Sequence, residues 1–267
     1  FCDAILKAKS IDRKAWLSLV TGAVSFLTSK GLSPKTCTER NGQTDLRSIR
    51  DNKPSSHTRT ATNSWTKETY NIDLLKIETR VSHSSRTFCD QGSETVIRLM
   101  GVIGPDSSFA MSRLLERLPR CLDQKGAVKT PPIAILNSGG GLLDDGYKLG
   151  NTLRQQGVTV VIENQKSCAS SCAVAFLGGA KRIIEDEGQI MFHAPYFSGR
   201  NELGVRDIDC DVGEQALAEL RNYYISMTDI EIGERLFERT MWYCSADDGW
   251  VVTGGAAAEL YGIATER

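Results

Sequence analysis

The order of apolar and polar segments predicts an α/β protein with a mostly parallel β-sheet, preceded by an N-terminal extension. From Glu94 onward, short runs of aliphatic and β-branched residues alternate with longer segments whose apolar residues recur every three to four positions. Several short runs are apolar at nearly every residue, which is typical of strands buried on both faces of a parallel sheet. Strands that alternate with helices at this spacing imply right-handed crossovers between parallel strands.

The individual elements follow from this pattern and from the residues that end helices. Gly157, Gly178 and Gly262 each follow a helical segment, at the position where glycine commonly ends a helix. A weak alternation between 70 and 82 predicts one more strand before the main α/β region. The other expected strands cover 94–103, 131–137, 158–164, 182–186 and 189–195, and the expected helices cover 105–118, 142–156, 169–177, 214–227, 231–241 and 256–261.

The chain before this region differs in composition. Within 1–37, basic residues precede the apolar run Trp16–Leu27, whose 12 residues are fewer than the about 20 that a membrane-spanning helix needs. We expect a helical extension there, an amphipathic helix rather than a signal remnant, because no small-residue cleavage site follows. Residues 38–69 are polar, with Trp65 as the only large aromatic residue, which predicts a linker or long loop. The α/β domain then covers 70–267.

Composition excludes some functions and leaves the compartment open. The 267 residues carry a net charge of −1, so no overall field favours nucleic acid or an anionic membrane, and no nucleic-acid partner is expected. Eight cysteines lie without a CxxC pair or zinc-ribbon spacing, and no metal is predicted. They fit either buried thiols in a cytoplasmic protein or disulfides in an oxidising compartment. Because the number is even, we expect a periplasmic or secreted protein.

A glycine-rich segment at 137–141, with the sequence NSGGG, lies between an expected strand and an expected helix. Glycines allow a sharp backbone turn, and exposed N–H groups at a helix N-terminus attract anionic oxygen. Such groups can hold a phosphate or form an oxyanion hole, and the simpler interpretation is a tight turn without function. The spacing matches neither a P-loop nor a dinucleotide-binding fingerprint.

The segment 168–173, with the sequence CASSCA, holds two serines at the expected start of a helix. Ser170 or Ser171 is a candidate nucleophile there, and helix capping is the simpler interpretation. Of three histidines, only His193 lies within an apolar strand, so it is the candidate general base unless it is a hydrogen-bonded core residue. All three segments follow expected parallel strands, at the edge where open α/β sheets bind ligands.

These segments resemble motifs of the Clp proteolytic subunit and the related signal peptide peptidases, within the Clp/crotonase superfamily. NSGGG is similar to that family's NSPGG, with Gly139 in place of proline, and CASSCA is similar to AASMGA. GGAKR followed by IMFHAP is similar to AG-x-KR followed by IMIHQP. Asp248-Gly249-Trp250 and the later AAAELYGIA are similar to the family's D-R-F and its ending. The resemblance covers 94–265 and is closer still to exported bacterial Clp-like proteins, which carry C-A-S-x-C.

The resemblance implies a Clp/crotonase-type ββα spiral and a serine hydrolase, in the first place a peptidase. It sets Ser170 as the nucleophile and His193 as the general base. It sets Asp248 as the carboxylate that orients the base, with the adjacent Asp247 as the alternative. A catalytically degenerate protein that binds peptides or assembles with a partner is the rival interpretation. A crotonase-type acyl-CoA enzyme would share the fold but would need no serine–histidine pair.

The resemblance also implies the remaining parts of the site and its partners. The N–H groups of Gly141 or Gly140 and of Ser171 would form the oxyanion hole. The implied substrate is a peptide or protein, the implied assembly is a homo-oligomer such as a ring or trimer, and no cofactor is needed. No ATPase-docking feature is visible in the sequence, so no ATPase partner is expected.

Two cysteines depart from the family pattern beside the nucleophile. We expect at least one disulfide to involve Cys168 or Cys172, and Cys210 or Cys244 could be the partner, because a bond between two cysteines four residues apart would be strained. A cysteine nucleophile activated by His193 is a weaker alternative. A metal site built on these thiols and His193 lacks a fourth ligand.

Overall fold

The computed structural model describes residues 56–60, 65–72, 74–82, 94–118, 130–200, 204 and 206–266. This part of the chain forms a ten-stranded sheet, a separate two-stranded hairpin and six helices. The strands are β1 (Ser56–Thr60), β2 (Trp65–Ile72), β3 (Leu75–Ser82), β4 (Glu94–Ile103), β5 (Ile133–Gly141), β6 (Thr159–Ile162), β7 (Ser167–Ala169), β8 (Lys181–Ile184), β9 (Gln189–Phe192), β10 (Phe197–Arg200), β11 (Arg206–Asp209) and β12 (Trp250–Thr253). The helices are α5 (Ser107–Arg117), α6 (Leu143–Gln155), α7 (Ser171–Leu177), α8 (Glu214–Met227), α9 (Ile230–Met241) and α10 (Gly255–Leu260).

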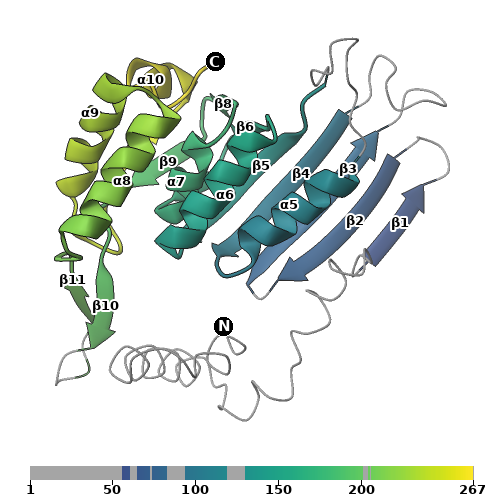
Figure 1. Ribbon diagram of the computed structural model, residues 1–267. Coiled ribbons are helices and arrows are strands. Elements are labelled where there is room, and N and C mark those ends of the chain that lie inside the picture. The colour runs from purple at the N-terminus through teal and green to yellow at the C-terminus, as the bar shows by residue number, and fades with distance from the viewer. Residues whose placement is uncertain are drawn as a thin grey trace.

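The large sheet is parallel in its centre and antiparallel at both ends (Figure 1). Its strand order is β1-β2-β3-β4-β5-β7-β9-β12, with β6 paired to β5 and β8. Five of its nine strand pairs are parallel. The strand β5 pairs with β6 through Ile133–Ile135 and with β7 at Ser138. Each of these short strands has a further parallel neighbour, β8 beside β6 and β9 beside β7. The predicted α/β class with a mostly parallel sheet is confirmed.

Helices α5 and α6 lie across one face of the sheet and bury an apolar stripe there (Figure 1). Leu114 of α5 and Leu149 of α6 are buried in the same core cluster as Ile97 of β4 and Leu136 of β5. Burying a leucine or isoleucine side chain contributes roughly 1.5–3 kcal/mol, so this contact holds β4 and β5 firmly. Their C-terminal ends, where the glycine-rich segment lies, are therefore fixed by the core.

The predicted linker at 38–69 is wrong for its second half. Residues 56–60 form β1, and β2 begins at Trp65, so the expected domain boundary at residue 70 falls inside a strand. Threonine is frequent in this polar segment and favours strands, and an antiparallel strand near a sheet edge needs no continuous apolar run. The expected helical extension at 1–37 lies outside the described residues.

Several short elements differ from the expectation. The expected strand at 70–82 is the end of β2 followed by β3, which pair antiparallel with Ile72 opposite Leu75. The expected helix at 169–177 is the end of β7 followed by α7, and the sequence pattern did not predict β10, β11 or β12. These strands have three or four residues, which is too few for a periodic pattern to show. Among the described helices, none is long and apolar enough to cross a bilayer.

Candidate active site

Ser170 occupies a sharp turn between β7 and α7. Its backbone angles are φ 58° and ψ −127°, and its N–H donates to the carbonyl of Met191 on β9 at 2.9 Å. A non-glycine residue at positive φ costs about 1–3 kcal/mol and persists only where the surroundings enforce it. A strained strand-to-helix turn of this kind leaves the hydroxyl group of a serine exposed at the end of the strand. Ser170 is partly exposed, whereas Ser171 is 1% exposed, so a substrate can reach only the first of the two serines.

Gly140 packs directly against this turn. A Cβ atom on Gly140 would lie 2.6 Å from the Ser170 Cβ and 2.7 Å from the Ala169 carbonyl oxygen, and the glycine has φ +99°. No other residue fits such a contact without movement of the turn. The Gly140 N–H donates to Ser138 Oγ at 3.0 Å, so this amide is already in use. The glycine-rich segment and the candidate nucleophile are therefore in contact.

A disulfide joins Cys168 to Cys172 across the same turn, with their Cα atoms 5.2 Å apart. The expectation that these cysteines pair with Cys210 or Cys244 is wrong, because Cys210 and Cys244 pair with each other. The expectation assumed a helical spacing for positions 168 to 172. The chain instead runs as a strand, reverses at Ser170 and enters α7, which brings the two Cα atoms within the usual range for a disulfide. Both sulfur-bearing residues are fully buried.

His193 directly follows β9, the strand next to β7. The parallel register pairs Ala169 with Met191, so Ser170 and His193 leave neighbouring strands at the same edge of the sheet. His193 is 9% exposed, and its Nδ1 lies 2.8 Å from the carbonyl oxygen of Ala194. A carbonyl can only accept a hydrogen bond, so Nδ1 carries the proton and Nε2 is left with a lone pair. The imidazole thus has the tautomer that a general base requires.

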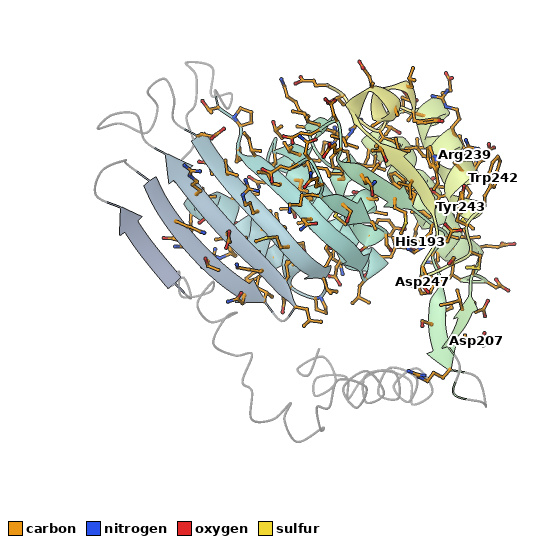
Figure 2. The ribbon with its side chains drawn as sticks, turned by 180° about the vertical axis from the view of Figure 1, so that it is seen from behind. His193, Asp207, Arg239, Trp242, Tyr243 and Asp247 are labelled. Atoms are coloured by element: carbon orange, nitrogen blue, oxygen red, sulfur yellow. A yellow bond between two sulfur atoms is a disulfide. The ribbon has the colours of Figure 1, made fainter. Side chains whose placement is uncertain are left out.

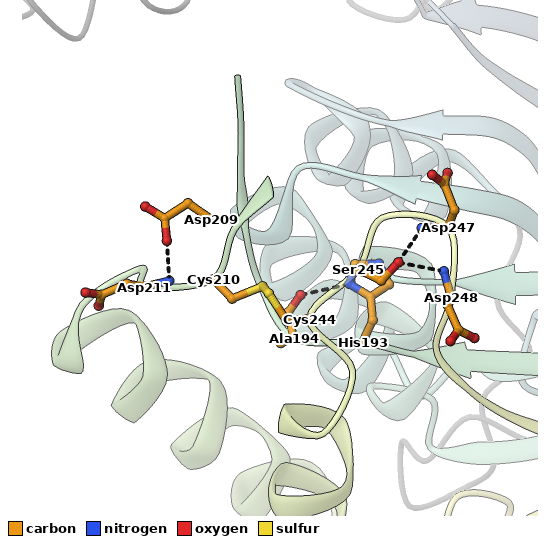
Figure 3. The surroundings of a disulfide bond; sticks show 9 residues. All are labelled: His193, Ala194, Asp209, Cys210, Asp211, Cys244, Ser245, Asp247 and Asp248. Carbon is orange, nitrogen blue, oxygen red and sulfur yellow. Dashed lines mark hydrogen bonds between the residues drawn. A yellow bond between two sulfur atoms is a disulfide. The ribbon is translucent and has the colours of Figure 1, made fainter. Parts of the chain in front are cut away.

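Asp248 lies near His193 in the backbone but does not contact its side chain. The antiparallel register pairs Trp250 of β12 with Phe192, which brings the segment before Trp250 alongside the end of β9. The Asp248 carboxylate accepts the N–H of Gly249 at 2.8 Å, and no hydrogen bond joins it to His193 in the described chain (Figure 3). Asp248 and Asp247 are both exposed. The Nδ1 partner of the imidazole is therefore the Ala194 carbonyl rather than a carboxylate.

The surroundings of His193 include two residues that the sequence did not single out, Tyr243 and Ser245. Tyr243 accepts the N–H of Ala194 through its carbonyl at 2.8 Å, and Figure 2 shows Tyr243 and His193 on the same side of the molecule. Ser245 Oγ accepts the N–H of Asp248 at 3.0 Å. The contact between Ala194 and Tyr243 joins segments about 50 residues apart in the sequence, and no local motif marks it. Among the described residues, no group of three or more His, Cys, Asp or Glu side chains could hold a metal ion.

One buried carboxylate lies at the start of α6, after the glycine-rich segment. Burial raises the pKa of Asp145 above its ordinary value; Lys148 opposes the shift, and the neighbouring charges of Asp144 and Asp106 add to it. Gly146, the next residue, packs against Ser171 of α7. The pattern of α6 predicted a helix but gave no sign that Asp145 would lie on its buried face.

No protein-family model and no curated protein matches the chain. Solved structures with a similar backbone include a variant of the 1510-N membrane-bound stomatin-specific protease, with a TM-score of 0.46 and 18% identity over 63% of this chain and 75% of that chain. ClpP1 from Listeria monocytogenes gives a TM-score of 0.45 and 18% identity over 64% of this chain and 89% of that chain. At this identity, both likenesses concern the fold alone.

Proposed function

We propose that this protein is a serine peptidase in which Ser170 attacks the scissile carbonyl and His193 takes the serine proton. The observation that carries the proposal is the meeting of three segments at one edge of the sheet. Gly140 touches Ser170, and the Ser170 N–H binds the carbonyl of Met191, two residues before His193. Ser170 and His193 follow neighbouring parallel strands at this edge, and nucleophilic acyl transfer requires such a serine and a histidine base within reach of each other.

The chemistry follows from these positions. The proton of Ser170 Oγ passes to His193 Nε2 as the oxygen attacks, and the carbonyl oxygen becomes an oxyanion. The N–H groups of Gly141 and Ser171 would hold this oxyanion, because the Gly140 amide is bound to Ser138 and the first N–H groups of a helix have no partner within it. The imidazolium then protonates the leaving amine, and water hydrolyses the acyl-enzyme in a second, equivalent step.

We assign Asp248 a supporting role in this site. Its negative charge lies on the loop beside the end of β9, where it would stabilise the imidazolium that forms during attack. The Ala194 carbonyl already holds Nδ1, which supports a serine–histidine pair whose orientation comes mainly from the backbone. The observation that favours the rival function, a degenerate Clp-like protein that binds peptides without cleaving them, is that no hydrogen bond joins the Asp248 carboxylate to His193 in the described chain.

The proposed substrate is an unfolded peptide or protein, and the proposed assembly is a homo-oligomer. Two large exposed apolar side chains, Trp242 directly after α9 (69% exposed) and Leu260 at the end of α10 (82% exposed), are the observation that supports an assembly. The two described disulfides support an oxidising compartment, periplasmic or extracellular. Sedimentation of the oxidised protein would measure the assembly, and a purely monomeric protein at micromolar concentration would contradict it.

Digestion of a fluorescent, unfolded casein tests the function. The wild type should release small peptides, and Ser170→Ala should release none while it unfolds at the same temperature as the wild type. Binding of casein without cleavage by the wild type, at every pH between 5 and 9, would instead support the degenerate protein. Cleavage that persists in purified Ser170→Ala would move the activity to another site.

A further inference from the structure

A short segment between α9 and β12, Tyr243–Ser245, forms hydrogen bonds with Ala194, the residue after the base, and with the loop that carries Asp248. The Tyr243 carbonyl accepts the N–H of Ala194 at 2.8 Å, and the Ala194 carbonyl in turn meets His193 Nδ1 at 2.8 Å. On the other side, Ser245 Oγ accepts the N–H of Asp247 at 3.1 Å and the N–H of Asp248 at 3.0 Å. The position of this segment therefore sets the position of both His193 and Asp248.

The middle residue of this segment is covalently anchored. Cys244 forms a disulfide with Cys210, which directly follows β11, and the two are 34 residues apart in the sequence (Figure 3). Residues 243–249 belong to no helix or strand, so few backbone ladder bonds hold them. A disulfide between residues 34 positions apart lowers the conformational entropy of the unfolded chain. The bond therefore ties the loop beside the base to the foot of the hairpin β10–β11.

The two described disulfides differ in access to solvent. Cys168 and Cys172 are fully buried beneath the nucleophile turn, whereas Cys244 is exposed and Cys210 is half-buried. Thiol–disulfide exchange requires a thiolate to reach one of the sulfur atoms, so the rate depends on this access. A soluble thiol should open the Cys210–Cys244 bond well before the Cys168–Cys172 bond.

We propose that the Cys210–Cys244 disulfide is a positioning device and that its reduction reversibly lowers the reactivity of Ser170. In the reduction, a thiolate of a dithiol attacks the sulfur of Cys210 or Cys244 and breaks the S–S bond between them, which gives a mixed disulfide between the protein and the dithiol. The second thiol of the reductant displaces the protein sulfur, so that two protein thiols form while the dithiol becomes a cyclic disulfide, with two electrons and two protons transferred. The inference rests on the proposed peptidase function, and it adds a redox control of the same site.

The test compares the oxidised protein, the protein after mild dithiothreitol treatment and the variant Cys210→Ser/Cys244→Ser. Mass spectrometry of trapped thiols establishes which bond has opened. The rate of fluorophosphonate labelling at Ser170 should fall by about 10- to 100-fold in the reduced and variant proteins, because a misplacement of about 1 Å can cost about 10²-fold. Reoxidation should restore the wild-type rate, and dithiothreitol should not change the rate of the variant further.

Hydrogen exchange separates positioning from unfolding and does not depend on activity. The amides of Ala194, Asp247 and Asp248 should exchange faster once the bond is open, while the Ser170 amide, bound to Met191, should stay protected. Unchanged exchange at these three amides would overturn the proposal, as would full-rate labelling of the reduced protein or of the variant. If the oxidised wild type is never labelled, the proposed function fails, and the exchange data still decide the positioning claim. Should the variant not fold, the reduced wild type carries both measurements.

Discussion

The two halves of the candidate site are built differently. The nucleophile half consists of β5, β7 and α7, and its contacts are buried: Gly140 lies against Ser170, and a buried disulfide closes the turn. The base half consists of the end of β9 and the loop before β12, where Asp248 is exposed and bonded to its own loop. The nucleophile turn is thus held by packing and a buried disulfide, whereas the orientation of the buried His193 ring also depends on a chain of single hydrogen bonds that starts at Tyr243 in the loop.

This difference has a physical consequence for control. A buried turn whose neighbours cannot move changes little with conditions, because packed interiors resist deformation. A loop held by a few hydrogen bonds and one exposed disulfide can shift at low cost. Regulation of the site, and variation in its rate, should therefore come from the base half.

The largest expected effect separates the two serines of the nucleophile half. Ser170→Ala should lower turnover by about 10⁶-fold, the size seen when a catalytic serine is removed, and should leave thermal stability nearly unchanged. Ser171→Ala is the matched control, because Ser171 Oγ is buried without a hydrogen-bond partner among the described residues. Its loss should leave both stability and turnover close to those of the wild type. The reverse pattern in a casein assay would mean that the nucleophile is Ser171.

The base half is tested first at the histidine. His193→Gln should lower turnover by a similar factor, because Nε2 is the only proposed proton acceptor for Ser170. Turnover of the wild type and the variant on casein, measured at one pH, checks this prediction. Full activity in His193→Gln would point to another base.

The loop carboxylates should give a smaller effect. Asp248→Asn should lower turnover by clearly less than the about 10⁴-fold that follows when a carboxylate bonded directly to the base is lost, because the Ala194 carbonyl holds Nδ1. Asp247→Asn, at the adjacent exposed position, serves as the control and should have a weaker effect still. Kinetics of the two variants at one pH are sufficient. A loss of about 10⁴-fold in Asp248→Asn would mean that its carboxylate replaces the carbonyl in the working enzyme.

The smallest effect concerns stability beside the nucleophile half. Burial raises the pKa of Asp145, so the folded protein binds this proton more tightly than the unfolded chain does. Where the carboxyl group is charged in both states, its burial destabilises the fold; as pH falls through the raised pKa, this penalty is relieved. Asp145→Asn should therefore stabilise the protein by up to about 1 kcal/mol at pH 7, with a smaller gain near pH 4. Denaturant unfolding at both pH values measures the difference, and destabilisation at pH 7 would contradict it.

The same contrast explains how far the sequence could predict this site. The nucleophile half could be predicted because NSGGG and CASSCA are continuous segments, so the residues that form each turn are neighbours in the sequence. The α/β class and the bounds of α8 were also predicted, since long periodic segments carry a strong signal. The sequence pattern by itself did not decide which of the two serines is the nucleophile. The greater exposure of Ser170 compared with Ser171 favours Ser170.

The base half could not be predicted in the same way. The contact from Tyr243 to Ala194, and the pairing of Cys210 with Cys244, depend on tertiary structure and leave no local pattern. The disulfide partner of Cys168 was wrongly predicted because the reversal at Ser170 was not foreseen. The edge strand β1 was missed because its short polar sequence resembles a loop in composition. The edge strand β12 was missed although its sequence, WVVT, has the aromatic and β-branched residues typical of strands, because four residues are too few to show a periodic pattern.

The central claim is that Ser170 is a nucleophile activated by His193, and covalent capture tests it most directly. The oxidised wild type should react with a fluorophosphonate, and mass spectrometry of the digested adduct should place one phosphonyl group on Ser170. His193→Gln should react far more slowly although the serine is intact. An adduct on another residue, or equal labelling of wild type and His193→Gln, would contradict the account.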